Sequence, residues 1–322
     1  MAYDATTVYL DLTNGPSSDD TQSSLMTIAH GLQNGFVAQT VRLTGDLENQ
    51  CTLFDRNNLC AATVGRYSAD GNSNASGMVI IGYRISDHSR IGAFVDENVT
   101  NADSYGVTYK NASPLVGAYW NWLEKQDETG LSTYVSGAYG TKDSSITRMV
   151  IGTSEPGTGN SALFSFGAEA EIRFGKFVTS SIMVQPYAGL RYTQLRSMGY
   201  SEATSASVGS PLNYADLVQE MTTALVGVHI SDRLDQHISA YSSFGVEQDL
   251  SLRGGELSPS GLSDLSSIDF TPGAKTRRPS AMAGISYDIA ANQRIQLDGM
   301  VKESIFTNTN SQIAMMKYQM GF

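Results

Sequence analysis

Two histidine-serine pairs are the residues of this sequence best suited to covalent chemistry. His229 and Ser231 are separated by one residue, and so are His237 and Ser239. Residues two apart on a β-strand share a face, so each histidine could serve as a base for the neighbouring serine in ester hydrolysis. Both pairs flank one short turn, and the isoleucine inside each pair predicts that its histidine lies on the polar face of the strand. We therefore expect two inward-facing histidines that carry out no catalysis.

No other arrangement of reactive side chains favours an enzyme. The remaining histidines, His30 and His88, lie outside the long polar links described below. The sequence has no metal-ligand spacing, no Gly-x-Ser-x-Gly nucleophile turn and no phosphate-binding glycine loop. We expect no catalytic residues, no metal site and no cofactor.

The two cysteines, Cys51 and Cys60, lie nine positions apart. An exported protein meets an oxidising compartment, where such a pair closes a short disulfide loop. The alternative is two unpaired thiols. The first residues lack the basic and apolar regions of a secretory signal, so for an exported protein we expect an excerpt of a longer precursor.

Composition narrows the class of protein. The chain has 322 residues, of which 41% are hydrophobic and 16% charged, and its formal net charge is -11. A nucleic-acid partner is not expected, because phosphate binding needs clustered Lys and Arg. No apolar run approaches the 18 or so residues of a transmembrane helix, and the many aromatic and β-branched residues exclude a disordered chain. A soluble β-rich protein or a membrane β-barrel remains, because alternating strands escape hydropathy analysis.

Alternation with a period of two recurs twelve times from residue 58 onward. Within 161–174, for example, Phe166 and Ile172 fall on one face, and Glu169 and Glu171 fall on the other. Most segments have the length that a tilted strand needs to cross a bilayer. The predicted strands are 58–67, 76–86, 90–98, 115–123, 131–142, 161–174, 180–195, 219–231, 237–250, 279–288, 294–305 and 311–322.

The links between these strands alternate between short and long, which favours the membrane barrel. Outer-membrane barrels have short periplasmic turns and longer extracellular loops, whereas a soluble sandwich has no reason to sort its links. The short links are 87–89, 126–130, 175–179, 232–236 and 291–293. The others are 99–114, 143–160, 196–218 and 251–278, which are long and polar, and 68–75 and 306–310, which are shorter.

The last predicted strand is the most specific feature of the sequence. Tyr318, Met320 and Phe322 continue an apolar face that includes Ala314 and Met316. A terminal aromatic residue preceded by apolar residues at every second position resembles the signal by which bacterial outer-membrane proteins are recognised by the barrel assembly machinery. We expect Tyr318, Met320 and Phe322 to form this assembly signal.

Residues 17–45 predict a helix rather than a strand. Ser17 and Asp19 suit a helix start, and apolar residues recur at helical spacing over about 20–40. Such a helix has a diameter of about 10–12 Å, and a barrel of twelve strands is wide enough to hold it. The alternative is a helix packed outside, at the periplasmic mouth. For a helix in the lumen, the expected contacts between helix and wall are Gln33, Asn34, Glu169, Glu171, Arg173 and Arg191.

The order of these features resembles the translocator domain of monomeric type V secretion autotransporters. A short N-terminal stretch, a helix and twelve alternating strands end in Tyr318-Gln319-Met320-Gly321-Phe322, and the stretch from Val184 to Tyr192 is similar to a strand common in those domains. The resemblance covers about residues 20–322. It implies a 12-stranded antiparallel transmembrane β-barrel, all-β in class, with an N-terminal α-helix in the pore. The corresponding division of the chain is 1–16 as the end of a passenger, 17–45 as the pore or linker helix, 46–57 as a connection with the Cys51–Cys60 disulfide, and 58–322 as the barrel.

The resemblance also implies a function and partners. The barrel would sit as a monomer in the bacterial outer membrane, with cell-surface loops and periplasmic turns, and would carry its own passenger domain to the cell surface. Outer-membrane lipid, lipopolysaccharide and the barrel assembly machinery would be its other partners. Some members of the family cut their chain between two asparagines, but Asn57-Asn58 lacks the surrounding motif, so we do not expect self-cleavage. The alternatives are a free-standing porin and a 12-stranded outer-membrane enzyme similar to the phospholipase.

Overall fold

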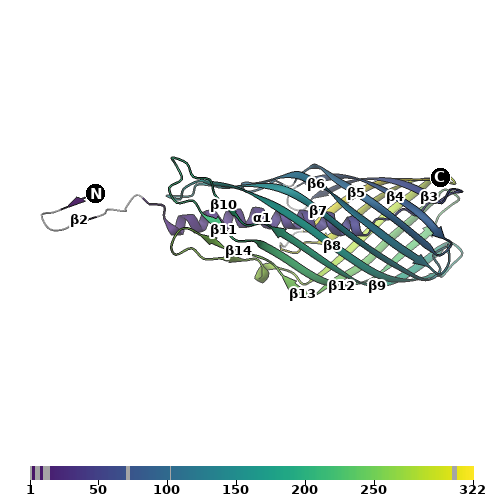
Figure 1. Ribbon diagram of the computed structural model, residues 1–322. Coiled ribbons are helices and arrows are strands. Elements are labelled where there is room, and N and C mark those ends of the chain that lie inside the picture. The colour runs from purple at the N-terminus through teal and green to yellow at the C-terminus, as the bar shows by residue number, and fades with distance from the viewer. Residues whose placement is uncertain (1, 4–7, 10–14, 70–72, 102, 307–309) are drawn as a thin grey trace.

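Long antiparallel strands form a closed barrel around a single long helix (Figure 1). This computed structural model describes residues 2–3, 8–9, 15–69, 73–101, 103–306 and 310–322. Within these residues the barrel has twelve strands. They are β3 (Leu59–Ala69), β4 (Ser73–Ser86), β5 (Ser89–Thr100), β6 (Val107–Leu123), β7 (Gly130–Arg148), β8 (Gly157–Phe177), β9 (Ile182–Ser197), β12 (Leu217–Arg233), β13 (Ile238–Arg253), β17 (Arg277–Ala290), β18 (Gln293–Glu303) and β19 (Asn310–Gly321).

Each barrel strand pairs with the strands next to it in the chain, and the barrel closes where β19 pairs with β3. At this closure Gly321 lies opposite Cys60, and Lys317 lies opposite Val64. The predicted fold, a 12-stranded antiparallel barrel with an N-terminal helix in the pore, is confirmed.

Several strands run further than predicted at one end. β6 begins at Val107 instead of residue 115, and β7 continues to Arg148 instead of residue 142. The outward residues of these extensions, such as Thr108 and Lys110, are polar, so the apolar outer face on which the prediction relied is missing there. The barrel wall therefore continues beyond its apolar belt.

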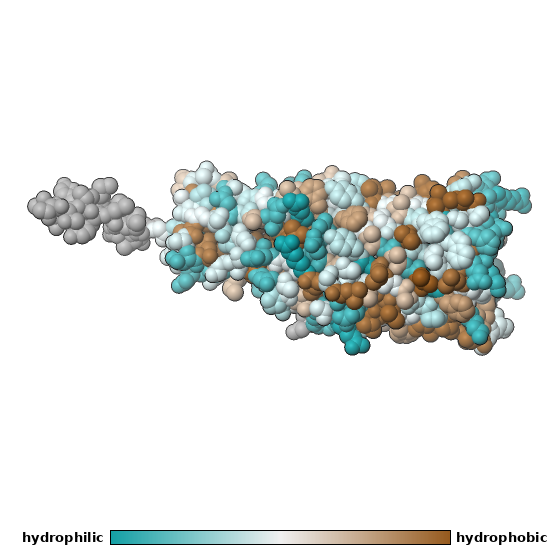
Figure 2. All heavy atoms as spheres, turned by 60° about the horizontal axis from the view of Figure 1, so that its bottom comes forward, coloured by the Kyte–Doolittle hydropathy of each residue, from teal (hydrophilic) through white to brown (hydrophobic). Residues whose placement is uncertain are grey.

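The outer face of the barrel carries exposed apolar side chains. Ile172 is 56% exposed, Val226 60% and Met316 58%, while the alternate residues on the same strands face the interior. Figure 2 shows the apolar side chains gathered over the part of the wall nearer the short links, with hydrophilic residues at the rim. This is the lipid-facing surface of a transmembrane barrel.

The long links gather at one end of the barrel, where they add small elements of their own (Figure 1). The link after β9 contains β10 (Tyr200–Ser201) and β11 (Asn213–Tyr214), which join β15 (Pro259–Ser260) in a three-stranded sheet. The link after β13 also contains β14 (Glu256–Leu257), β16 (Ile268–Asp269) and the 3₁₀ helix η1 (Thr271–Gly273).

Helix α1 (Ser18–Leu47) lies along the barrel axis, with its N-terminus at the long-link end (Figure 1). Ser17 caps it, since its Oγ accepts a hydrogen bond from the Asp20 N–H at 3.3 Å. Its thirty residues span about 45 Å at 1.5 Å per residue, and the helix runs beyond the predicted range to Leu47. No described helix is both long enough and apolar enough to cross a bilayer.

Two short strands lie before the helix in the sequence. β1 (Ala2–Tyr3) pairs with β2 (Val8–Tyr9). The sequence analysis assigned 1–16 to the end of a passenger, and residues 1, 4–7 and 10–14 of that range lie outside the described residues.

Candidate functional site

The candidate functional site is the pore of the barrel, which α1 occupies. Apolar residues of α1 are buried between the helix and the strands β6 to β8, with Leu32, Phe36 and Leu43 each no more than 2% exposed. The wall also contributes buried, inward-facing apolar residues, such as Leu163 and Tyr134. Only part of the lumen is therefore polar, and burial of these side chains at about 25 cal/mol per Å² stabilises the helix inside the barrel.

Glycines bring the helix close to the wall. A Cβ atom on Gly31 would lie 2.6 Å from the Ser104 carbonyl oxygen, and a Cβ on Gly35 would overlap the Tyr109 ring and hydroxyl. Further along, the position of a Cβ on Gly45 is 3.4 Å from the Arg66 guanidinium carbon. Glycine has the lowest helix propensity after proline, yet here its missing side chain is what allows the contact.

Two crossed ion pairs join the helix to strands β3 and β5. Arg42 Nε lies 2.6 Å from Asp96 Oδ2, and Arg42 Nη2 donates to the Asp96 carbonyl oxygen at 2.6 Å. One turn further along, Asp46 accepts from Arg66 Nη2. All four side chains are at most 5% exposed. We call Arg42, Asp46, Arg66 and Asp96 the crossed clamp.

A second charged group covers the opposite wall and meets the end of the helix. Arg191 Nη1 lies 3.2 Å from both Glu48 Oε1, at the C-cap, and Glu169 Oε2. Arg191 Nη2 pairs with Glu247 Oε1. Lys302 Nζ lies 2.5 Å from the same oxygen. We call this group the wall network, and its members are Glu48, Glu169, Arg191, Glu247, Asp249, Arg278 and Lys302.

The wall residues singled out from the sequence all lie inside the barrel, with different contacts. Arg191 contacts the helix end directly through Glu48, whereas Glu169 reaches it only through Arg191. Glu171 pairs with Arg173, whose guanidinium lies 5.6 Å from the centre of the Tyr134 ring.

The helix residues singled out from the sequence meet none of these carboxylates. Asn34 Nδ2 lies 3.4 Å from Ser104 Oγ in the link after β5. Gln33 is half-buried, and its side chain makes no hydrogen bond to any residue that the structure describes. The sequence analysis overlooked Arg42 and Asp46, although a pair of opposite charges four residues apart on an apolar helix was a visible signal.

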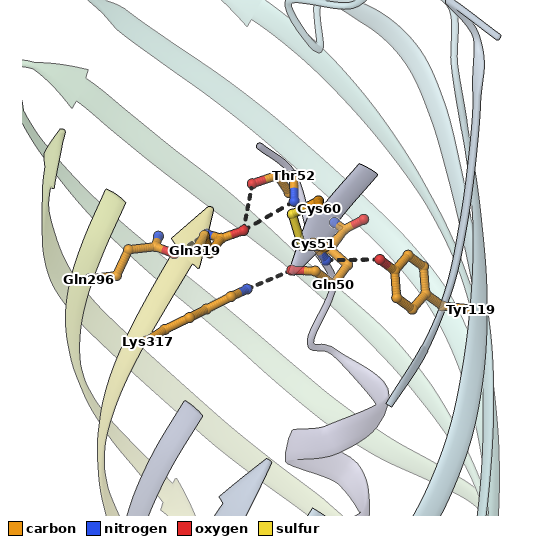
Figure 3. The surroundings of a disulfide bond; sticks show 8 residues. All are labelled: Gln50, Cys51, Thr52, Cys60, Tyr119, Gln296, Lys317 and Gln319. Carbon is orange, nitrogen blue, oxygen red and sulfur yellow. Dashed lines mark hydrogen bonds between the residues drawn. A yellow bond between two sulfur atoms is a disulfide. The ribbon is translucent and has the colours of Figure 1, made fainter. Parts of the chain in front are cut away.

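The segment after α1 closes the short-link end of the pore (Figure 3). Cys51 and Cys60 form a disulfide that joins this segment to the start of β3. The Cys51 N–H donates to the Tyr119 hydroxyl at 3.0 Å, and Lys317 Nζ donates to the Gln50 carbonyl at 2.6 Å. The wall thus holds the segment on several sides.

A cavity of about 330 Å³ remains beside this segment. It lies between the end of α1 and the strands β8, β9, β12, β13 and β17 to β19. Charged side chains of both signs line it, including Glu171, Arg173, Asp298, Lys302 and Lys317. Apolar side chains such as Leu225, Met282 and Met300 also line it, so the lining is mixed.

The two histidines of the histidine-serine pairs lie in different surroundings. His229 faces the lumen as predicted, where its ring stacks on Tyr187 with 4.6 Å between ring centres. The prediction that His237 also faces inward is wrong: it precedes β13, so strand alternation does not reach it, and its Nδ1 lies 3.0 Å from the Asp288 carbonyl oxygen at the exposed rim. Among the described residues neither histidine bonds to a serine, and no group of three or more His, Cys, Asp or Glu could hold a metal ion.

The last residues of the chain lie at the closure of the barrel. The Phe322 N–H donates to the Leu59 carbonyl at 2.9 Å, and the Tyr318 hydroxyl donates to Gln293 Oε1 at 3.1 Å. Met320 pairs with Ala61 across the same strands. Phe322 itself is 43% exposed on the outer face.

Comparison with known proteins points to one family. Residues 61–301 match the sequence profile described as the autotransporter beta-domain. A search among curated protein sequences found no match. The fold is similar to that of the translocator domain of the autotransporter NalP from Neisseria meningitidis, with 15% identity, 95% of this chain and 100% of that chain covered, and a TM-score of 0.61. It is also similar to the beta domain of the Bordetella autotransporter BrkA, with 14% identity, 83% and 100% coverage, and a TM-score of 0.52.

Proposed function

Because the chain belongs to the autotransporter beta-domain family, we propose that it inserts in the bacterial outer membrane and delivers its own N-terminal passenger to the cell surface. The observation that carries this proposal is the helix in the pore. α1 enters at the long-link end and is tied to the wall by the crossed clamp, the wall network and the disulfide. A chain held in this way has one end on each side of the barrel.

The direction of delivery follows from the two ends of the barrel. Short turns face the periplasm in outer-membrane barrels, and long loops face outward. The N-terminus of α1 lies at the long-link end (Figure 1). We infer that residues 1–16 are the end of a passenger outside the cell, 17–45 the pore helix, 46–57 the disulfide-bearing connection and 58–322 the barrel.

The proposed partners each have a surface on the barrel. The apolar outer wall suits lipid and, at the long-link end, lipopolysaccharide. Tyr318, Met320 and Phe322 lie on the strand that closes the barrel, where the assembly machinery would recognise them. A single barrel already encloses its pore, which agrees with a monomer. The role is transport, without catalysis.

Surface delivery is tested by an epitope tag placed before residue 15 in cells that express the full chain. We expect protease added to intact cells to remove the tag while the barrel stays folded, as judged by its heat-dependent migration on a gel. A tag that remains protected until the cells are lysed, although the barrel is folded in the outer membrane, contradicts the proposal.

Conductance separates the translocator from a free-standing porin. The helix and the following segment fill most of the lumen, so we expect a low single-channel conductance for the full chain and a large increase when residues 1–45 are deleted. Large open currents from the full chain would favour the porin.

A further inference from the structure

We propose that the crossed clamp fixes the register at which the chain comes to rest in the pore. This inference deepens the proposed function, because it concerns where an exported chain stops. The helix contributes Arg42 and Asp46, and the wall contributes Asp96 and Arg66 in the opposite order. The two charges on each side are opposite in sign, so the clamp fits in one position and is mismatched in the neighbouring positions.

The smallest slip that keeps the same helix face toward the wall is about four residues, or about 6 Å. After such a slip toward the long-link end, Asp46 would lie where Arg42 now lies, opposite Asp96. After a slip the other way, Arg42 would lie opposite Arg66. Either movement breaks both ion pairs and brings two like charges together. Because all four side chains are buried, water screens this repulsion poorly.

The glycine contacts reject the same two slips independently of charge. A slip toward the long-link end places Gln39 against Tyr109, where Gly35 leaves no room even for a Cβ atom. A slip the other way places Thr27 against the Ser104 carbonyl, which lies 2.6 Å from the Cβ position of Gly31. Steric contacts near the middle of the helix and charges near its C-terminus therefore select the same register.

Cysteine cross-linking measures this register. Gln39 Nε2 lies 2.9 Å from Ser165 Oγ on β8. Two residues along a strand cover about 6–7 Å, which is close to one helical turn. A cysteine at position 39 should therefore cross-link to S165C in the native register, to L163C after a slip toward the long links, and to G167C after a slip the other way. Peptide mapping distinguishes each product from the native disulfide.

Charge exchange tests the clamp. With the natural charges we expect Q39C to cross-link mainly to S165C. Exchanging the helix charges in R42D/D46R should lower that product about tenfold relative to the slipped products, as expected when the native register loses about 1.4 kcal/mol. Exchanging the wall charges as well, in R42D/D46R/R66D/D96R, should restore the S165C product. The neutral pair R42Q/D46N should lower the S165C fraction by less, because the glycine contacts still favour the native register.

Barrel folding is monitored in every variant by heat-dependent migration. If R42D/D46R fails to fold, the neutral and fourfold variants decide the question. An S165C fraction in folded R42D/D46R or R42Q/D46N that is no lower than with the natural charges overturns the proposal, and so does a folded fourfold variant that does not restore that fraction. The epitope assay separates the register proposal from the export proposal. If the tag is accessible but the variants keep the native register, only the role of the crossed clamp is refuted. If the tag is protected but the cross-links shift as expected, only the export function is refuted.

Discussion

Arg148 and Glu202 form a two-bonded ion pair across 54 positions of the chain, at the long-link end of the barrel. The Arg148 Nε and Nη2 atoms lie 2.8 Å and 2.9 Å from the two carboxylate oxygens, and both side chains are at most 2% exposed. Glu202 also accepts from the Tyr214 hydroxyl at 2.9 Å and the Leu212 N–H at 3.0 Å. One carboxylate therefore anchors the link 198–216 to the end of β7.

Removing that carboxylate should release the link. In E202Q the Arg148 guanidinium stays buried without its charge partner, which costs about 3 kcal/mol of local stability, or roughly a hundredfold in protease cleavage within 198–216. The double variant R148M/E202L buries no unpaired charge and should be cleaved more slowly than E202Q. Equal cleavage of E202Q and the unaltered protein would show that the pair does not anchor the link.

Alkaline pH should loosen the same link. Burial raises the pKa of Tyr214 above its ordinary value of 10.0, with further contributions from Tyr200 and Glu202. The folded link keeps this phenol protonated where an unfolded link would ionise it. Its stabilising effect is therefore complete below pH 10 and is lost as the pH rises above 10.

This loss is measured as subtilisin cleavage of the link between pH 8 and pH 11, with an unstructured peptide as the control for protease activity. Y214F cannot ionise at this position, so its cleavage should change about tenfold less per pH unit above pH 10. Parallel pH profiles for Y214F and the unaltered protein would disagree with this assignment.

The disulfide should stabilise the closed end of the pore. Cys51 and Cys60 are nine positions apart, and closing a loop of this size stabilises a fold by about 2–3 kcal/mol. We expect C51S/C60S to unfold at correspondingly lower urea concentration in detergent. C51S alone should behave like the double variant, since either removes the cross-link. Unchanged unfolding in both would mean that the hydrogen bonds with Lys317, Tyr119 and Gln319 suffice, the last of these being accepted by Gln319 Oε1 from the Thr52 N–H at 3.1 Å.

Neighbouring methionines on β19 provide a matched test of which face meets lipid. Met316 is 58% exposed on the outer wall, whereas Met315 lines the lumenal cavity. Arginine at a lipid-facing position costs about 2–4 kcal/mol near the bilayer midplane. M316R should therefore unfold more readily in lipid vesicles than M315R. If M315R unfolded more readily than M316R, the assignment of the Met316 face to lipid would be contradicted.

The sequence predicted the barrel because strand alternation and link lengths are local signals. On β8 every second residue, such as Phe166 and Ile172, is apolar and faces lipid. This alternation is typical of a strand whose two faces meet different surroundings. The extension of β7 to Arg148 could not be predicted in this way, because its outward residues Asp143, Ser145 and Thr147 are polar beyond the apolar belt.

The contacts inside the pore were harder to predict because they depend on the rotation and depth of the helix. Gly31 and Gly35 counted against a helix by propensity, yet they allow its closest approach to the wall. Glu171 and Arg173 are adjacent on one face of β8 and satisfy each other, so neither needs a helix partner. Helical periodicity indicates which residues are buried, but not which strand they meet.

The pairing of β3 with β19 bears on how the molecule is built. These strands are the first and last of the barrel, and the disulfide ties the helix-bearing segment directly beside their seam. An open sheet can close around a chain that already lies along its inner surface, with β3 and β19 pairing last. No free end then has to be threaded through a finished cylinder, however large the part that precedes the helix.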